Sequence, residues 1–296
     1  MTVVRSNSID LMIDRRGKQT DPAILLIAGL GFQLIDWPTS FCDELVAAGF
    51  QVIRFDNRDI GLSQKLDQQG YVDIQAILSA KMIGQNPFVP YQLKDMAADA
   101  AGLLKELNVG PAHIVGMSMG GMIAQLLAAE YPDQVLSLTS IMSSSSDLSL
   151  PGPNPEAAAI LASAPQSQQK ADIVQFGLRV NDVIGSPGFR WNRSDLKAHI
   201  EACIDRNYSP MGYMRQYAAV MAAPSRRSKL KTITAPTLVI HGVDDPLVPL
   251  ACGKDVADYI PGSHFEAVAG MGHDLSPSLC AQLAKLILPH VKAGAA

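Results

Sequence analysis

Short apolar runs alternate along this chain with stretches in which apolar residues recur at helical spacing. The run at 23–27, Ala-Ile-Leu-Leu-Ile, contains no polar positions, which is typical of a strand covered on both faces. From residue 93 to residue 107 the apolar positions follow the period of an amphipathic helix. We predict strands at 10–15, 23–27, 51–55, 112–116, 135–142, 235–241 and 264–269, and helices at 41–48, 93–107, 120–130, 252–259 and 279–291.

Strands that alternate with helices indicate βαβ units, and therefore an α/β fold with a mostly parallel sheet and helices on both faces. The alternation lapses once, between Asp147 and Thr232, where a Pro- and Gly-rich start leads into helical patterns without a convincing strand. It resumes at residue 235. We therefore predict one α/β core, formed by residues 1–146 and 233–296, into which residues 147–232 are inserted as a mainly helical cap.

A serine lies at the junction of a predicted strand and a predicted helix. The segment Gly116-Met117-Ser118-Met119-Gly120 has the G-x-S-x-G pattern, follows the strand at 112–116 and opens the helix at 120–130. This setting places a serine on a sharp turn above the sheet edge, where glycines let neighbouring backbone pass closely. Ser118 is therefore a candidate nucleophile. The alternative is a serine that only caps the helix behind a glycine turn.

A serine nucleophile needs a base and a group that orients the base. Asp245 follows the strand at 235–241 and His273 follows the strand at 264–269, in the chain order Ser, Asp, His. Each candidate thus follows the carboxyl end of a strand, where open α/β sheets bind ligands. Two other aspartates, Asp244 and Asp147, compete for the role of the acid. For the base, His113 is expected in the core and His241 lies at a strand end. The remaining histidines have no motif around them: His199, His264 and His290.

Composition narrows the classes of function. The chain of 296 residues has a net charge of -4 and basic residues scattered singly, so it offers no basic surface for nucleic acid. The longest apolar run, 23–32, is too short to span a membrane, and the N-terminus lacks signal-peptide features, so we expect a cytoplasmic protein. The cysteines lie far apart, with no C-x-x-C pair and no histidine at metal-ligand spacing, and we expect buried or half-buried thiols at Cys42, Cys203, Cys252 and Cys280.

Together these motifs resemble the α/β-hydrolase superfamily over nearly the whole chain. The segment 56–63, Asp-Asn-Arg-Asp-Ile-Gly-Leu-Ser, looks like that family's D-x-R-G-x-G-x-S segment but has Asp59 where glycine is usual. With Gly-Met-Ser-Met-Gly and Gly-Met-Gly-His, the chain is most similar to bacterial hydrolases of the aclacinomycin methylesterase type. The resemblance implies a serine hydrolase, and it implies a structural rather than a catalytic role for Arg58.

Acyl transfer also needs two N–H donors that stabilise an oxyanion. We predict that they are the backbone amides of Met119, which follows the nucleophile, and Leu30, in the loop Ala-Gly-Leu-Gly-Phe at 28–32. The family more often has His-Gly-x-Gly at this loop, so its first position departs from the pattern. Gly31 or Phe32 is the donor if the loop is shifted, and a loop whose glycines serve only packing is the remaining alternative.

These observations predict an enzyme that hydrolyses a carboxylic ester of a small, mainly apolar substrate through an acyl-enzyme, without metal ion or organic cofactor. His273, oriented by Asp245, takes the proton of Ser118, so we expect activity to fall when the histidine is protonated. Phe32 and Trp37 flank the loop and are predicted to border the substrate.

Other functions stay open at this point. The same triad serves lactonases, C–C bond hydrolases and cofactor-free perhydrolases, and a non-catalytic ligand-binding protein of the same fold is a further alternative. No nucleic-acid or membrane partner is expected. The sequence leaves the oligomeric state open, a homo-oligomer included.

Overall fold

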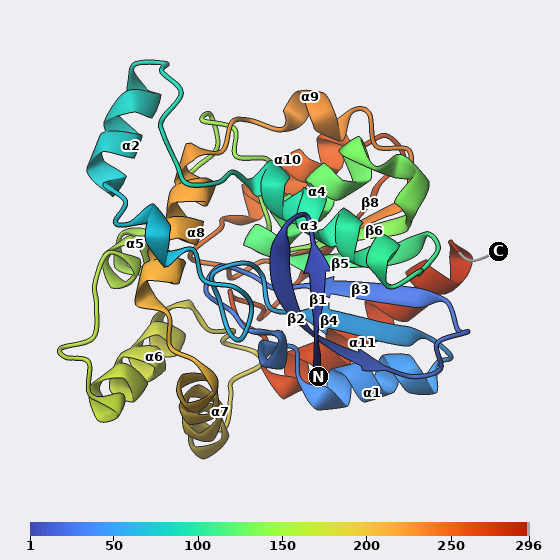
Figure 1. The fold of residues 1–296 in the computed structure, drawn as a ribbon, viewed down its shortest axis with the longest axis horizontal. Helices are drawn as coiled ribbons and strands as arrows, with labels where there is room; N and C mark the ends of the chain where they lie inside the picture. Colours follow the sequence, from blue (N-terminus) through green and yellow to red (C-terminus); the bar gives the residue numbers. More distant parts are fainter. Residues whose placement is uncertain (295–296) are drawn as a thin grey trace.

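A sheet of eight strands forms the centre of the computed structural model, which describes residues 1–294 (Figure 1). The strand order is β1-β2-β4-β3-β5-β6-β7-β8. β2 is antiparallel to both of its neighbours, and the remaining pairs are parallel, which confirms the predicted mostly parallel sheet. The strands are β1 (Thr2–Ser6), β2 (Ile9–Arg16), β3 (Ala23–Ile27), β4 (Gln51–Phe55), β5 (Ala112–Met117), β6 (Val135–Ile141), β7 (Thr237–Gly242) and β8 (His264–Val268).

Helices cover both faces of the sheet because the central strands are apolar on both sides. In β3, Leu25 and Ile27 belong to one core cluster, whereas Ile24 and Leu26 belong to the other. The first cluster is closed by α3 (Leu93–Glu106), α4 (Met119–Glu130) and α10 (Leu250–Tyr259), and the second by α1 (Thr39–Ala47) and α11 (Pro277–Ala293). Apolar and polar residues do not alternate at 23–27 because, as predicted, both faces of this strand are covered. None of the helices in residues 1–294 has the length and hydropathy needed to cross a membrane.

Among the described residues, the chain between β6 and β7 forms helices and no strand. The helices are α5 (Pro155–Leu161), α6 (Lys170–Ile184), α7 (Arg193–Arg206), α8 (Pro210–Ala222) and α9 (Arg227–Leu230). α6 and α7 share a small apolar cluster around Leu178 and Leu196, and α8 packs on α2 (Ile74–Met82) through Ala218 and Ile77. In Figure 1, α2 and α5 to α8 lie together beside the sheet. The division of the chain at 147 and 232 stays a prediction.

Outside the segment between β6 and β7, one strand and one α-helix, β1 and α2, are absent from the sequence prediction. β1 is an edge strand whose residues are mostly exposed, and it pairs only with β2. α2 is capped by Asp73, whose carboxylate accepts the backbone N–H of Ala76 at 3.0 Å, and only Ile77 of the helix residues is buried. Hydrophobic periodicity reports a buried face, so elements with little buried surface give a weak signal.

His113 lies in β5 at the centre of the sheet and is completely buried. Its Nδ1 shares a hydrogen bond of 2.8 Å with Ser137 Oγ. Burial, with a smaller contribution from the charge of His290, lowers the pKa of His113 to about 4. This confirms His113 as a core residue, held in its neutral form.

We expect His113 to make the protein less stable in mild acid. The unfolded chain binds a proton at this histidine below pH ~6.5, whereas the folded chain does so only below pH ~4, so the free energy of unfolding falls as pH drops through that window. At pH 5 the loss from this residue is about 2 kcal/mol relative to neutral pH. Urea unfolding of wild type and His113→Asn between pH 5 and 8 measures it. The variant should lose less stability on acidification than wild type does, and an equal pH dependence of the two proteins would contradict this prediction.

Candidate active site

Ser118 occupies a strained turn between β5 and α4. Its φ of 52° lies in the left-handed region, which non-glycine residues rarely adopt. The flanking glycines make room for the turn: a Cβ on Gly116 would lie 2.2 Å from the Gly120 carbonyl oxygen, and a Cβ on Gly120 would lie 2.1 Å from that of Ile27. The turn is therefore pressed against the carboxyl end of β3, and it leaves the Ser118 side chain half-buried.

His273 joins Ser118 to Asp245. Its Nε2 lies 3.0 Å from Ser118 Oγ, and its Nδ1 lies 2.7 Å from Asp245 Oδ2. An ionised carboxylate only accepts hydrogen bonds, so Nδ1 is the protonated nitrogen and Nε2 is free to accept the serine proton. The structure thus brings together the three side chains that the motifs indicate, from the loops after β5, β7 and β8.

Asp245 is buried but is held in its charged form. Its Oδ1 accepts the backbone N–H groups of Leu247 at 2.9 Å and Val248 at 2.8 Å. Burial alone would raise the pKa of this carboxyl, but the charge of His273 and the hydrogen bonds from His273 and Val248 outweigh it and keep the pKa below its ordinary value. A charged Asp245 suits an imidazole that must become positive.

The competing acids and base have other partners. Asp244 Oδ2 accepts the backbone N–H of Gly270 at 2.7 Å, and Asp147 pairs with Arg227 at 2.9 Å. His241 is completely buried, and its Nε2 donates to the Val248 carbonyl at 2.7 Å. Burial lowers the pKa of His241, so this residue is a neutral neighbour of the site, with Nε2 3.8 Å from Asp245 Oδ2.

Of the three candidate donors in the loop at 28–32, the backbone N–H groups of Leu30, Gly31 and Phe32, two have hydrogen-bond partners. The N–H of Gly31 donates to Gln216 Oε1 at 2.9 Å, and the N–H of Phe32 donates to the Gly29 carbonyl at 3.2 Å. Within residues 1–294 the structure gives the N–H of Leu30 no hydrogen-bond partner. The N–H of Met119 belongs to the first residue of α4, where helices leave N–H groups without an internal acceptor. Of the three loop amides considered from the sequence, Leu30 is the one available to a ligand.

Residues 22–277 match the family described as alpha/beta hydrolase fold. The chain belongs to this family. Among its curated relatives, rhodomycin D methylesterase DnrP of Streptomyces peucetius is 25% identical over 309 residues, and the alignment covers 98% of each sequence. Rhodomycin D methylesterase DauP of Streptomyces sp. strain C5 is 26% identical, with the same coverage. The predicted resemblance to bacterial methylesterases is thereby confirmed.

Solved structures of similar fold include the meta-cleavage product hydrolase of Pseudomonas fluorescens IP01. It superposes with a TM-score of 0.73 at 16% identity and covers 99% of this chain and 98% of its own. A thermophilic esterase from Thermogutta terrifontis has a TM-score of 0.67 at 23% identity, with coverage of 99% and 98%. These likenesses confirm the α/β-hydrolase fold.

The two aromatic residues predicted to border the substrate are placed differently in this α/β hydrolase. Phe32 is half-buried on the loop after β3. Trp37 is completely buried, stacked on Phe41 with ring centroids 5.5 Å apart, in the cluster that packs α1 on the sheet. The predicted substrate contact of Trp37 does not fit this position, because α1 draws the ring into the core.

A second loop of the site is held by the helical segment between β6 and β7. The backbone N–H of His273 donates to the Ile184 carbonyl at 2.7 Å. Asp274, the next residue, accepts hydrogen bonds from Ser186 Oγ at 2.5 Å and from Asn181 Nδ2 at 2.8 Å. Sequence reasoning missed these contacts, because nothing near residue 274 indicates a partner almost ninety positions earlier.

Three potential metal ligands meet where α7 contacts the loop before α1. His199 Nε2 lies 2.8 Å from Asp36 Oδ1, and Cys203 Sγ lies 3.6 Å from that nitrogen. Burial lowers the pKa of His199, but the hydrogen bond and charge of Asp36 outweigh it and raise the pKa. The histidine and aspartate therefore satisfy each other as an ion pair. The expectation of no histidine at ligand spacing from a cysteine is wrong here, since one helical turn separates His199 from Cys203.

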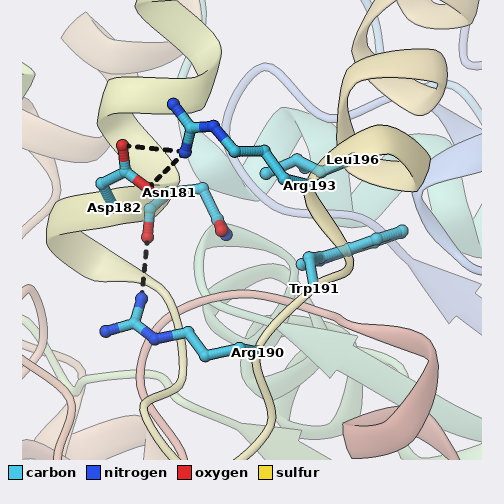
Figure 2. A pocket seen from close by; sticks show the side chains of 6 residues that line it. All are labelled: Asn181, Asp182, Arg190, Trp191, Arg193 and Leu196. Carbon is cyan, nitrogen blue, oxygen red and sulfur yellow. Dashed lines mark hydrogen bonds and ion pairs between the residues drawn. The ribbon is translucent and has the colours of Figure 1, made fainter.

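Two pockets lie on the helical segment and its neighbours. One, of about 340 Å³, opens between α6 and α7, and Figure 2 shows Trp191 and Arg190 at its rim and Arg193 paired with Asp182. The other, of about 390 Å³, lies between α4, α8 and the segment before α3, near Leu126 and Ala219. Neither contains a residue of the Ser118 site.

The contact between the Ser118 turn and β3 predicts that alanine substitutions at two glycines change the stability of the protein by different amounts. Gly120→Ala places a methyl group against the Ile27 carbonyl, and we expect the free energy of unfolding to fall by about 1–3 kcal/mol. Gly110→Ala, where the new Cβ meets nothing within 4 Å, is the matched control and should remain close to wild type. Urea unfolding of both variants makes the comparison. Equal stability would mean that the turn does not press on β3.

Proposed function

We propose that this α/β hydrolase cleaves carboxylic esters of small, mainly apolar substrates, with Ser118 as nucleophile, His273 as general base and Asp245 as the acid that orients the base. The observation that carries the proposal is the hydrogen-bond chain from Ser118 Oγ through His273 to Asp245, with lengths of 3.0 and 2.7 Å. Family membership and the methylesterase relatives support ester hydrolysis as the reaction.

In the first half of the reaction, His273 Nε2 takes the proton of Ser118 Oγ as that oxygen bonds to the carbonyl carbon of the ester. The negative charge of Asp245 stabilises the imidazolium that forms. The carbonyl oxygen becomes an oxyanion and accepts the N–H groups of Leu30 and Met119. The C–O bond to the alcohol then breaks, the alcohol leaves with the proton from His273, and Ser118 carries the acyl group.

Water completes the reaction by the same route. His273 takes a proton from the water molecule as its oxygen bonds to the acyl carbon, and a second oxyanion forms at the same two N–H groups. The bond to Ser118 Oγ breaks, and His273 returns the proton to the serine. The products are a carboxylic acid and an alcohol, and the free enzyme is restored.

Aromatic side chains near the oxyanion loop support an apolar substrate. Tyr213 of α8 lies against Gly31, so close that a Cβ there would be 2.6 Å from the ring. Tyr213 stacks with Tyr217, and Phe32 stands half-buried on the same loop. We assign substrate selection to these rings and to the proposed cap at 147–232.

Ser118→Ala tests the proposed nucleophile. We expect hydrolysis of chromogenic esters to fall by roughly 10⁶-fold, because the remaining groups form no acyl-enzyme. A fluorophosphonate probe should label wild type at Ser118, as located by peptide mass spectrometry, and should not label the variant. Circular dichroism checks that both proteins are folded. Folded wild type that is not labelled, and that cleaves nothing in a panel of esters of graded chain length and of lactones, would favour the non-catalytic alternative.

Two adjacent aspartates allow a matched test of the orienting acid. Asp245→Asn removes the charge beside His273 and reverses the hydrogen bond that fixes its tautomer, so we expect kcat to fall by about 10⁴-fold. Asp244→Asn alters only the contact with the Gly270 amide and should remain close to wild type. Steady-state kinetics on one ester compares them. A larger loss in the Asp244 variant would move the role to that residue.

A further inference from the structure

Helix α8 is docked against the two loops that follow β3 and β4. A Cβ on Gly212 of α8 would lie 2.1 Å from the Asp59 carbonyl oxygen, so helix and loop touch backbone to backbone. The ring of the next residue, Tyr213, lies against Gly31. This helix therefore reaches the loop that supplies the proposed Leu30 donor.

Gln216 of α8 is completely buried and hydrogen-bonds to both loops. Its Oε1 accepts the N–H of Gly31 at 2.9 Å, and its Nε2 donates to the Arg58 carbonyl at 2.8 Å. A buried carboxamide that loses a hydrogen-bond partner destabilises the folded protein. The two hydrogen bonds therefore hold the Gln216 side chain in one orientation. Gln216, which follows Gly31 by 185 positions, thus links the loop after β3 to the loop after β4.

The hydrogen bond to Gly31 fixes the shape of a turn. The Gly29 carbonyl accepts the N–H of Phe32 at 3.2 Å, and Gly31 has a φ of +72°, as in the third position of a type II turn. Types I and II differ by a rotation of the central peptide, here the Leu30–Gly31 bond. Gln216 holds the N–H of that peptide and so selects type II.

The other end of the loop is fixed on the Ser118 side. The Ala28 carbonyl accepts a hydrogen bond from Asn57 Nδ2 at 3.0 Å, and a Cβ on Gly29 would lie 3.4 Å from Ser118 Cβ. The loop is therefore held by Asn57 at its start and by Gln216 at its turn. The N–H of Leu30 lies between these two anchors and has no partner of its own among the described residues.

A buried ion pair places Gln216. Arg215, its neighbour in α8, donates from Nε and Nη2 to the two carboxylate oxygens of Asp59, at 2.9 and 2.7 Å. Neither side chain is exposed. A two-pronged pair of this kind has a fixed geometry, so it sets the position of α8 along the loop. Asp59 is the residue at which the 56–63 segment departs from the family pattern.

We propose that Gln216 is a positioning residue for the oxyanion: its carboxamide fixes the turn at 29–32 so that the Leu30 N–H meets the developing negative charge, and the Arg215–Asp59 pair seats it. This proposal rests on the proposed function, because it assigns Gln216 a part in stabilising an intermediate of ester hydrolysis. It predicts that Gln216 affects the transition state more than the binding of substrate.

Gln216→Met tests the proposal, because it keeps the length of the side chain and removes both hydrogen bonds. We expect kcat to fall about 10- to 100-fold, with KM within about twofold of wild type. The inhibition constant of a trifluoromethyl ketone, which adds to a serine to form a stable oxyanion, should rise in parallel with the loss of kcat/KM. Lys81→Met is the matched control. Lys81 bonds the Met221 and Ala223 carbonyls at the far end of α8, so this variant loosens the helix without touching the loop.

Gln216→Glu adds a second measurement, the pH dependence of kcat, which would not change if Gln216 only stabilised the fold. When protonated, the carboxyl can accept from Gly31 and donate to Arg58, as the carboxamide does. Its kcat relative to wild type at the same pH should therefore rise as pH falls, whereas the ratio for Gln216→Met should stay flat.

The outcomes separate this proposal from the one on which it rests. Wild type without esterase activity or Ser118 labelling would remove the proposed function itself. Active wild type with a Gln216→Met variant of unchanged kcat would overturn only the positioning role. Equal losses of kcat in Gln216→Met and Lys81→Met would also overturn it, since both would then reflect loosening of α8.

Discussion

The close contact between the Ser118 turn and the end of β3 is the constraint on which the rest of the site depends. Gly120 approaches the Ile27 carbonyl so closely that no side chain fits between them. This contact places the first turn of α4 beside the loop that follows β3, and so sets Ser118, the proposed nucleophile, next to the amides of that loop. The positive φ of Ser118 is the local strain that the contact requires. Packing of α4 on the sheet compensates for it, since ten residues of this helix are buried.

The helical segment between β6 and β7 completes the site rather than only covering it. Ile184, the last residue of α6, accepts the N–H of His273, and Ser186 donates a hydrogen bond to the carboxylate of Asp274. In the same segment, α8 holds the loop after β3 through Gln216, which accepts the N–H of Gly31. The loops carrying the proposed base and the proposed Leu30 donor are therefore both hydrogen-bonded to the same inserted segment. The proposed selection of substrate by this segment would therefore be linked to the geometry of the proposed reacting groups.

Much of this arrangement could be predicted from the sequence, because it depends on patterns among residues that are close together in the chain. The buried strands, the G-x-S-x-G turn and the positions of Asp245 and His273 after strands follow from periodicity and chain order. Gln216, Ser186 and the Asp36–His199 pair could not be predicted in this way. Each is an ordinary polar residue in a helical or turn pattern, and its role arises only from a partner more than eighty positions away. Trp37 shows the converse, since a position near the loop suggests the site while α1 buries the ring.

The aspartate at position 59, where the family usually has glycine, has a physical explanation in the structure. Its φ of 74° explains why glycine suits this position, and aspartate is among the residues that tolerate this region best. In return, aspartate supplies a carboxylate for Arg215, which glycine does not offer. Bringing both charges out of water costs free energy that their attraction only partly returns, so the pair contributes less to stability than to specificity. A shift of α8 by one residue would leave two buried charges unpaired, at a cost of several kcal/mol. The pair therefore excludes other docking positions of the helix that carries Gln216, and the position it permits is the one in which the loop beside Ser118 is held.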